Sequence, residues 1–240
     1  MEVTSAIRAI GRIARATESL YDTASMVLSE FDSKQLLRTY GIATVEEALA
    51  QNADEAVSLS LSLGYPVAIK LCASGLAHKT ERNLVRLGIS GDEAVRSAAL
   101  DLLARREPSE ADARLLVQRM VSGRRELILG LVRDRQFGPC VMLGFGGILA
   151  EAIGDVVFRV APLSHVDAVE MVADLKTAHL LGCFRAEPAV DRDALAAALV
   201  ALGRIGVERS EVVSIDVNPM IVCGDRPLAV DALVEIAEQP

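Results

Sequence analysis

Apolar runs separated by a polar segment are clearest in residues 64–89, whose sequence is GYPVAIKLCASGLAHKTERNLVRLGI. Residues 67–69 and residues 84–89 are mainly apolar runs next to turn residues, a pattern typical of strands. The segment between these runs consists largely of small and polar residues. The pattern therefore predicts a strand, an exposed loop, and a second strand that returns beside the first.

The polar residues of this stretch indicate an anion site. Lys70 follows the first apolar run, and burying its ammonium group costs free energy unless the group meets an anion. The loop adds His78, Lys79 and Thr80, which offer a titratable nitrogen, a fixed cation and a hydroxyl. Together the four side chains suit a phosphate chain. The alternative is a solvated loop and a lysine whose head reaches water, and spacing alone leaves both interpretations open.

Helical and strand periods continue through the rest of the chain. Helices are predicted over residues 3–20, between Ser29 and Gly41, between Asn52 and Gly64, and over residues 94–106 (begun by Ser90 and Glu93), 165–175 and 191–205. Further strands are predicted over residues 114–121, 126–133, 141–143, 155–160, 212–218 and 226–234. This order predicts an α+β chain with two unequal lobes of mixed sheet, a lobe boundary near residues 110–120, and a ligand cleft between the lobes.

Two further segments are candidates for ligand contacts. Residues 144–147, GFGG, precede an apolar run and can expose a nest of backbone amides to an anion, although a tight turn is the alternative. Gln118, Arg119 and Met120 lie near the end of a predicted strand. Backbone groups at such an end often bind an adenine edge, but ordinary strand termination explains the same pattern.

The last predicted hairpin is a candidate metal site. Residues 214, 216 and 218 are Ser, Asp and Asn, and they share one face of a strand. A two-residue turn at residues 224–225 would place Asn218 opposite Asp231, with Cβ atoms about 5 Å apart. Such oxygens, with Asp216 nearby, suit Mg²⁺ bound jointly with phosphate, whereas a surface Asn–Asp pair is the alternative. Pro219 favours an edge or a bulge, where the register can shift by one residue.

Composition and charge narrow the function classes. The net charge of −8 argues against nucleic acid or an anionic membrane as the main partner. No apolar run approaches the roughly 18 residues of a spanning helix, and the N-terminus lacks the apolar core of a signal peptide. The four cysteines are far apart and form no CxxC pair. These features predict a cytoplasmic protein in a reducing compartment.

The motifs, taken in order, resemble one family. The pieces are GYPVAIK, HKT, LVRLGI, GRRELILG, RDRQFGP, GFGGILAE, FRVAPL, IDVNPMIV and AVDA. In this order and spacing they resemble the ATP-grasp part of NDP-forming acyl-CoA synthetases, with the succinyl-CoA synthetase β subunit as a more distant relative. The resemblance covers residues 27–236. It implies an N-terminal helix and linker over residues 1–26, and an ATP-grasp domain over residues 27–240 with two α/β lobes and a nucleotide cleft between them.

The resemblance also implies a site that binds ATP or ADP with Mg²⁺. The residues implied to contact the nucleotide are Lys70, Gln118, Arg119, Met120, Glu126, Gly146 and Gly147. Lys70 would bind its phosphates, and residues 118–120 would line the adenine pocket. Asn218 and Asp231 would hold the metal, supported by Asp216. His78 would carry a phosphoryl group, and Lys79 would neutralise charge during transfer.

The expected activity is acyl-CoA + ADP + phosphate = acid + ATP + CoA. Nothing in the sequence resembles a CoA-binding lobe, so the resemblance implies a partner, the CoA-binding α subunit. Two other functions remain open: a carboxylate–amine ligase of the ATP-grasp class, and a non-catalytic nucleotide-sensing module. The second is favoured only by Asn83-Leu84, which replaces a glycine pair of many relatives. Those two side chains are expected to narrow the approach to phosphate.

Overall fold

The computed structural model describes residues 25–76, 79, 82–147, 154–183 and 187–237. The chain divides into two compact units. We call residues 27–33 and 45–121 the small unit, and the remaining described residues, 25–26, 34–44 and 122–237, the large unit. The predicted helix over residues 3–20 lies outside the described residues.

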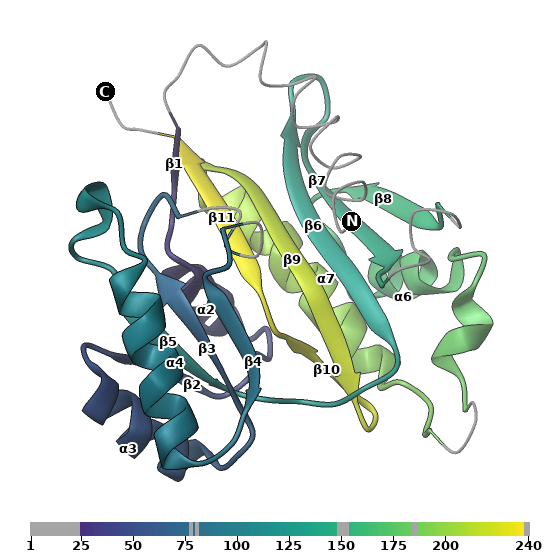
Figure 1. The fold of residues 1–240 in the computed structure, drawn as a ribbon. Coiled ribbons are helices and arrows are strands. Elements are labelled where there is room, and N and C mark those ends of the chain that lie inside the picture. Colours follow the sequence, from purple (N-terminus) through teal and green to yellow (C-terminus); the bar gives the residue numbers. More distant parts are fainter. Residues whose placement is uncertain (1–24, 77–78, 80–81, 148–153, 184–186, 238–240) are drawn as a thin grey trace. The chain divides into compact units, whose positions relative to one another are not determined.

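The small unit is a four-stranded sheet with two helices (Figure 1). The strand order is β2 (Glu47–Ala50), β5 (Arg114–Arg119), β3 (Val67–Cys72) and β4 (Val85–Ile89). Helices α3 (Ala53–Leu63) and α4 (Asp92–Ala104) follow β2 and β4, and the short 3-10 helix η1 (Pro108–Glu110) precedes β5. All three strand pairs are antiparallel, so the predicted mixed sheet is wrong for this unit.

Strand β3 divides its side chains between two environments. Val67, Ile69 and Leu71 belong to a hydrophobic core that also contains buried residues of β5, α3 and α4. Because side chains alternate along a strand, Ala68 and Lys70 point to the opposite face. Every residue of β3 is buried, so Lys70 is enclosed although it lies outside the apolar core.

The large unit is a seven-stranded sheet with helices. The strand order is β1 (Ser25–Val27), β11 (Ala232–Ala237), β9 (Val212–Cys223), β6 (Glu126–Asp134), β7 (Gly138–Phe145) and β8 (Val156–Val160), and β10 (Arg226–Ala229) also pairs with β9. The remaining elements are α2 (Glu30–Thr39), α6 (His165–Ala173), the 3-10 helix η2 (Ala178–Leu181) and α7 (Arg192–Glu208). The division between the two units cuts β1 after Met26 and α2 after Ser33.

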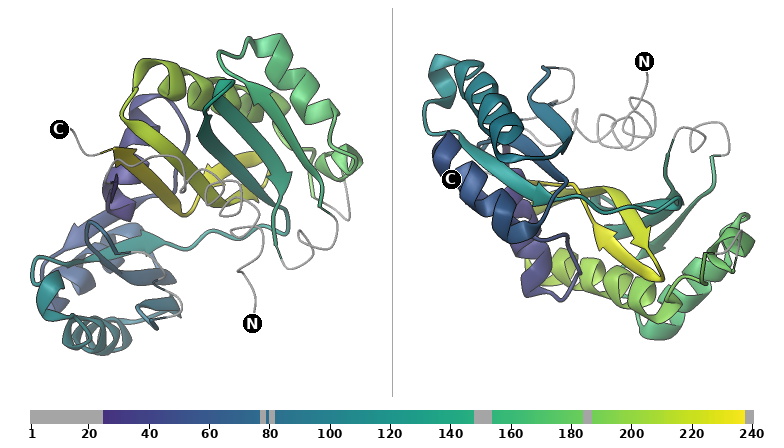
Figure 2. Two further views of the ribbon diagram at one scale, coloured as in Figure 1. Left: turned by 90° about the horizontal axis from the view of Figure 1, so that it is seen from above. Right: turned by 60° about the horizontal axis from the view of Figure 1, so that its bottom comes forward.

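Helix α7 lies along one face of this sheet, as Figures 1 and 2 show. Leu195, Leu199, Leu202 and Ile205 recur at helical spacing and are completely buried. Near the end of the helix the contact becomes very close. A Cβ atom on Gly206 would lie 2.7 Å from Cβ of Pro139 and 2.9 Å from Cδ1 of Leu131. A glycine at this position therefore allows α7 to approach β6 and β7.

Most predicted elements are present, with three differences. Helix α4 begins at Asp92, and its N-cap is Gly91, with no side-chain hydrogen bond, rather than Ser90. The strand predicted over residues 226–234 is two strands, β10 and β11, separated at residues 230–231. Strand β9 extends past the predicted end to Cys223. Across the described residues, no helix is both long and apolar enough to cross a membrane.

The contact of α7 with β7 gives a stability prediction. Alanine is about 1 kcal/mol better than glycine inside a helix, so Gly206→Ala would stabilise an unhindered helix. Here the new methyl group would meet the Pro139 ring, which cannot turn away, and we expect the melting temperature to fall. Gly203→Ala is the control, because its nearest neighbour is the flexible Cδ1 of Leu163 at 3.1 Å. Equal or higher melting temperatures for Gly206→Ala than for Gly203→Ala would contradict this packing.

Candidate functional site

Two lysine ammonium groups share one buried carboxylate in the small unit. Glu30 accepts a hydrogen bond from Nζ of Lys70 at 2.6 Å and forms a second ion pair with Lys79. The side chains of Glu30, Lys70 and Lys79 are 1%, 6% and 11% exposed. Two ammonium groups held close together favour a nearby anion, as the sequence predicts for Lys70 and Lys79.

The capped start of α2 places Glu30 in this cluster. Oγ of Ser29 accepts the amide hydrogen of Asp32 at 3.1 Å, and the amide of Ser33 donates to the Ser29 carbonyl at 2.8 Å. Glu30 then occupies the first turn, where the helix dipole favours a carboxylate. The sequence motif indicated only the cap. No local pattern shows that Glu30 meets a lysine 40 positions later.

Strand β3 and the loop after it are joined to the chain around Glu30. The amide of Gly75 donates to the carbonyl of Val27 at 2.9 Å, just before α2. Cys72 ends β3 beside the start of the helix. Burial raises the pKa of the Cys72 thiol, and the Glu30 carboxylate raises this pKa further. A backbone hydrogen bond with Phe31 lowers the same pKa. His78, the predicted phosphoryl carrier, lies outside the described residues.

Gln118 shares a sheet face with Lys70. It is 1% exposed and lies opposite Ala68, two residues before Lys70. On its other side it lies opposite Glu47 of β2, a polar neighbour that sequence reasoning missed. The side chains of Gln118, Glu47 and Lys70 thus belong to the face that the apolar core of this unit does not use. These groups can position a polar ligand next to the ammonium cluster.

The neighbouring residues Arg119 and Met120 already use their backbone amides. The amide of Arg119 donates to the carbonyl of Glu46 at 2.9 Å, and that of Met120 donates to Pro66 at 3.2 Å. The Arg119 guanidinium is exposed and pairs with the Glu46 carboxylate at 3.1 Å. An adenine contact made by residues 119–120 would consequently use their carbonyl oxygens or side chains.

In the large unit, Glu126 and the two glycines assigned to nucleotide binding are adjacent. The amide of Gly146 donates to the carbonyl of Glu126 at 2.7 Å, and a Cβ on Gly146 would lie 3.3 Å from Glu126 atoms. Gly147 has φ +82°, and a Cβ there would lie 3.7 Å from Oε2 of Glu126. The Gly146 amide is thus engaged within the chain, which argues against its part in an anion nest. Residues 148–153, which follow, lie outside the described residues.

Arg125 anchors the strand start that carries Glu126. Its buried guanidinium donates to the carbonyls of Gly182, Pro188 and Gly224 at 3.1, 2.7 and 3.3 Å. One side chain thereby joins three separate segments at the beginning of β6. Sequence reasoning missed this role, because Arg125 lies in a predicted loop next to another arginine and resembles a solvated residue.

The register predicted for the last hairpin is confirmed. Strands β10 and β11 both pair with β9 as a two-residue turn requires, and Ala232 lies opposite Val217. Asp231 lies between β10 and β11, and its carbonyl accepts a hydrogen bond from the amide of Asn218 in β9 at 3.2 Å. Asn218 and Asp231 therefore face each other. The one-residue shift that a proline favours occurs on the other side of β9, where the register with β6 changes near residues 127–129.

Asp216 lies two residues before Asn218, on the same face of β9. Its Oδ1 atom is inaccessible to water and has no hydrogen-bond partner within the described structure. Burial, with a smaller contribution from the Asp231 carboxylate, raises the pKa of Asp216 to about 7. Ser214, the third polar residue of this face, instead donates to Oε2 of Glu235 at 3.0 Å. The face thus brings two carboxylates and one amide together.

Lys34 supports the chain beside Asp231. It lies in α2 and is completely buried, and its Nζ donates to the carbonyl of Val230 at 3.1 Å. The amide of Val230 in turn donates to Pro219 at 3.0 Å. These bonds hold the segment between β10 and β11 against β9. A buried lysine so close to the candidate metal ligands is a further feature that local sequence patterns did not reveal.

The hairpin residues fit a magnesium ion. Mg²⁺ prefers oxygen ligands and usually binds one or two carboxylates together with water and phosphate oxygens. A cation would compensate the repulsion between Asp216 and Asp231 and give the buried Oδ1 a partner. Among the described residues there is no group of three or more His, Cys, Asp and Glu placed to hold a metal. The donor set of Asp216, Asp231 and Asn218 therefore suits a metal that phosphate oxygens also bind.

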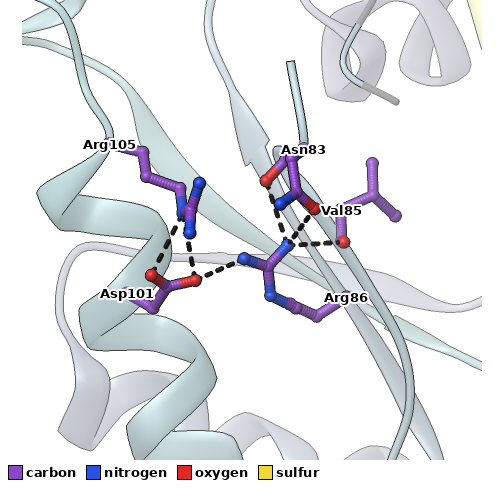
Figure 3. Close-up of polar contacts among 5 residues, drawn as sticks. All are labelled: Asn83, Val85, Arg86, Asp101 and Arg105. Atoms are coloured by element: carbon purple, nitrogen blue, oxygen red, sulfur yellow. Dashed lines mark hydrogen bonds and ion pairs between the residues drawn. The ribbon is translucent and has the colours of Figure 1, made fainter. Parts of the chain in front are cut away.

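The Asn83-Leu84 pair has roles other than the expected one (Figure 3). Leu84 is 1% exposed and belongs to the apolar core, so the expectation that it narrows the approach to phosphate is wrong. Asn83 has φ 56°, in the left-handed region that glycine favours and asparagine tolerates. Its Oδ1 and carbonyl oxygen both accept from Nη1 of Arg86 at 3.0 Å. Arg86 also pairs with Asp101 of α4.

Comparison with known proteins identifies the family of the chain. The ATP-grasp domain family matches residues 19–236. The chain is 38% identical to the β subunit of ADP-forming acetate–CoA ligase I from Pyrococcus furiosus, over 92% of this chain and 97% of that protein. Among solved structures, Ca. Korarchaeum cryptofilum ACD1 in complex with coenzyme A has a TM-score of 0.81 at 36% identity, covering 93% of this chain and 97% of that chain.

A second structure from the same organism contains a nucleotide analogue. It is the dinucleotide-forming acetyl-coenzyme A synthetase 1 in complex with coenzyme A and Mg-AMPPCP, with a phosphohistidine segment pointing towards the nucleotide-binding site. Its TM-score is 0.74 at 36% identity, covering 94% of this chain and 98% of that chain. The fold of the present chain is an ATP-grasp fold of the α+β class. The chain belongs to the ATP-grasp family, in the group of the β subunits of ADP-forming acetate–CoA ligases.

The raised pKa of Asp216 predicts a pH-dependent stability. The folded protein prefers the protonated form, because the pKa of Asp216 rises from 3.8 to about 7 on folding. The contribution of this group to stability is therefore present at low pH and lost as the pH rises from about 4 towards 7. In the presence of a chelator, Asp216→Asn should remove that loss, so its melting temperature should decline less than that of the parent over this range. Parallel profiles of the two proteins would contradict the shift.

Proposed function

We propose that this chain is the nucleotide-binding subunit of an ADP-forming acyl-CoA synthetase, which converts acyl-CoA, ADP and phosphate to acid, ATP and CoA. The observation that carries the proposal is the pair of buried ammonium groups on one carboxylate, in a chain of this family. The names of the relatives support a ligase that couples a CoA thioester to ATP formation rather than a carboxylate–amine ligase.

Lys70 and Lys79 bind the phosphates of the nucleotide. Their two ammonium groups lie together on one carboxylate, and their low exposure strengthens the attraction to a phosphate oxygen. The side chain of Gln118, on the same sheet face as Lys70, and the carbonyls of residues 119–120 orient the adenine. Glu126 and the adjacent glycines complete the nucleotide contacts.

Asn218 and Asp231 hold magnesium, and Asp216 supports them. The bound ion supplies charge neutralisation at the phosphate oxygens. The hairpin register keeps Asn218 and Asp231 opposite each other, and one carboxylate oxygen of Asp216 is inaccessible to water. A donor set of three residues leaves part of the coordination sphere to phosphate, as a nucleotide-bound magnesium requires.

His78 carries the phosphoryl group. The bond between phosphorus and the imidazole nitrogen breaks, and a bond forms between phosphorus and a terminal oxygen of ADP. The nitrogen keeps the electron pair, and a proton carried by the other ring nitrogen makes the regenerated imidazole neutral. Lys79, the next residue, neutralises charge on the group in transit. The related Korarchaeum structure, whose phosphohistidine segment points towards its nucleotide-binding site, supports phosphoryl transfer through a histidine.

A CoA-binding α subunit supplies the remaining chemistry. Relatives of this chain are named as β subunits, which supports a hetero-oligomer. The partner binds CoA and the acyl group, and the present chain binds the nucleotide. We place this assembly in the cytoplasm, where ADP, ATP and CoA are available.

Two variants separate binding from transfer. Lys70→Ala should weaken MgADP binding by about ten- to a hundredfold, because one charge-assisted contact is lost. His78→Ala should retain MgADP binding but abolish ATP formation in the complex with the α subunit. Calorimetry and a coupled ATP assay give the two values, and Lys176→Ala is a control that removes a lysine outside the site. Unchanged affinity in Lys70→Ala, or full turnover in His78→Ala, would remove that residue from its role.

The metal pair is tested by a double-mutant cycle. Asn218→Ala and Asp231→Ala should each raise the magnesium concentration needed for half-maximal ADP binding. The double variant should lose less than the sum of the two single losses, because both residues act through one ion. Magnesium titrations of the four proteins provide the comparison. Single variants that titrate like the parent, or losses that simply add, would identify the pair as structural.

A further inference from the structure

The carboxylate of Glu30 has no part in the nucleotide and metal contacts of the proposed function. It is the residue on which both phosphate-binding lysines converge within the small unit. We propose that Glu30 is a positioning residue for phosphoryl transfer: it holds the ammonium groups of Lys70 and Lys79 in the arrangement that the transferred group requires. This inference rests on the proposed function and assigns a further residue to it.

The two lysines need a common acidic partner to stay close together. Each ammonium ends a flexible side chain with four rotatable carbon–carbon bonds, and two such groups repel each other. The Glu30 carboxylate accepts from Lys70 at 2.6 Å through Oε1 and pairs with Lys79 through Oε2. One oxygen per lysine fixes both heads relative to a single rigid group. Their side-chain entropy is then lost on folding rather than during the reaction.

Glu30 itself has little freedom to move. Its side chain is 1% exposed, and its backbone lies in a first helical turn that Ser29 caps. Displacing the carboxylate by a phosphate would break two ion pairs of a buried carboxylate, which costs more free energy than a phosphate contact contributes. The structure therefore favours a fixed Glu30 that orients the lysines over an internal competitor that a nucleotide must displace.

The position of Lys79 connects Glu30 to transfer rather than to binding alone. Lys79 is the sequence neighbour of His78, the proposed phosphoryl carrier. A contact that fixes the ammonium group of Lys79 also fixes the positive charge that stabilises the phosphoryl group during transfer. Loss of the contact should consequently lower the turnover number more than the ground-state affinity for nucleotide.

Two variants of Glu30 and one control test this role in the complete complex with the CoA-binding subunit. Glu30→Asp keeps the charge but withdraws the carboxylate by about 1.5 Å, the length of one carbon–carbon bond. Glu30→Gln keeps the length but removes the negative charge between the two ammonium groups. Glu93→Gln makes the same acid-to-amide change at an exposed position in the first turn of α4. Calorimetry with MgADP and with pyrophosphate measures binding, and ATP formation measures turnover.

We expect turnover to fall about ten- to a hundredfold in both Glu30 variants, as for a catalytic group misplaced by about 1 Å. The dissociation constant for MgADP should stay within about threefold of the parent value, a change of less than 1 kcal/mol. Glu93→Gln should match the parent in both measurements. Glu30→Asp keeps the negative charge between the two lysines, so this variant tests the geometry of the cluster even if Glu30→Gln folds poorly.

Two results would overturn the proposal. If either Glu30 variant binds MgADP or pyrophosphate about tenfold more tightly at parental turnover, Glu30 is an internal competitor of the nucleotide. If affinity and turnover fall by the same factor in Glu30→Asp, Glu30 only maintains the binding site. The parent complex reports separately on the proposed function: a parent that forms no ATP contradicts that function, whereas active Glu30 variants contradict the positioning role alone.

Discussion

The pairing of Lys70 and Lys79 with one buried glutamate constrains much of the small unit. Lys70 lies in a strand that is buried on both faces, and an ammonium group is tolerated there only with an anionic partner. Its partner comes from the segment before β2, so the chain must bring the start of α2 back to the end of β3. The Ser29 cap and the bond from Gly75 to Val27 accomplish this. The local architecture around β3 thus follows from one electrostatic requirement.

In the large unit, neighbouring carboxylates rather than ammonium groups lie close together. Strand β9 places Asp216 and Asn218 on one face, and the hairpin register adds Asp231 opposite Asn218. Two neighbouring carboxylates repel each other, and the raised pKa of Asp216 expresses that repulsion together with its burial. A cation relieves this repulsion, as an anion is attracted by the lysine cluster. One group of residues is therefore suited to phosphate and the other to magnesium, the two charged components of a metal–nucleotide complex.

Local patterns predict the elements well, and long-range contacts poorly. The periods of strands and helices give the element types, and a two-residue turn determines the β9 register, because both depend on neighbouring residues. Glu30 is recognisable in sequence only as part of a cap, since its lysine partner is 40 positions away. The position of Glu47 opposite Gln118 is also not predictable from local sequence, because it depends on which strands pair. The predicted start of α4 is wrong because Gly91 uses no side-chain hydrogen bond as a cap.

The Asn83-Leu84 pair shows why a departure from a family motif needs a structural test. In sequence, two side chains in place of two glycines indicate an obstructed phosphate loop. In the structure, asparagine adopts the positive φ that would otherwise favour glycine, and Arg86 binds its side chain. Leu84 packs into the core of the small unit instead of facing a ligand. The substitution therefore adds packing and a hydrogen bond while keeping a backbone conformation that glycine also provides. It gives no reason to regard the chain as a non-catalytic module, and the competence of the site depends instead on the geometry of its charged groups.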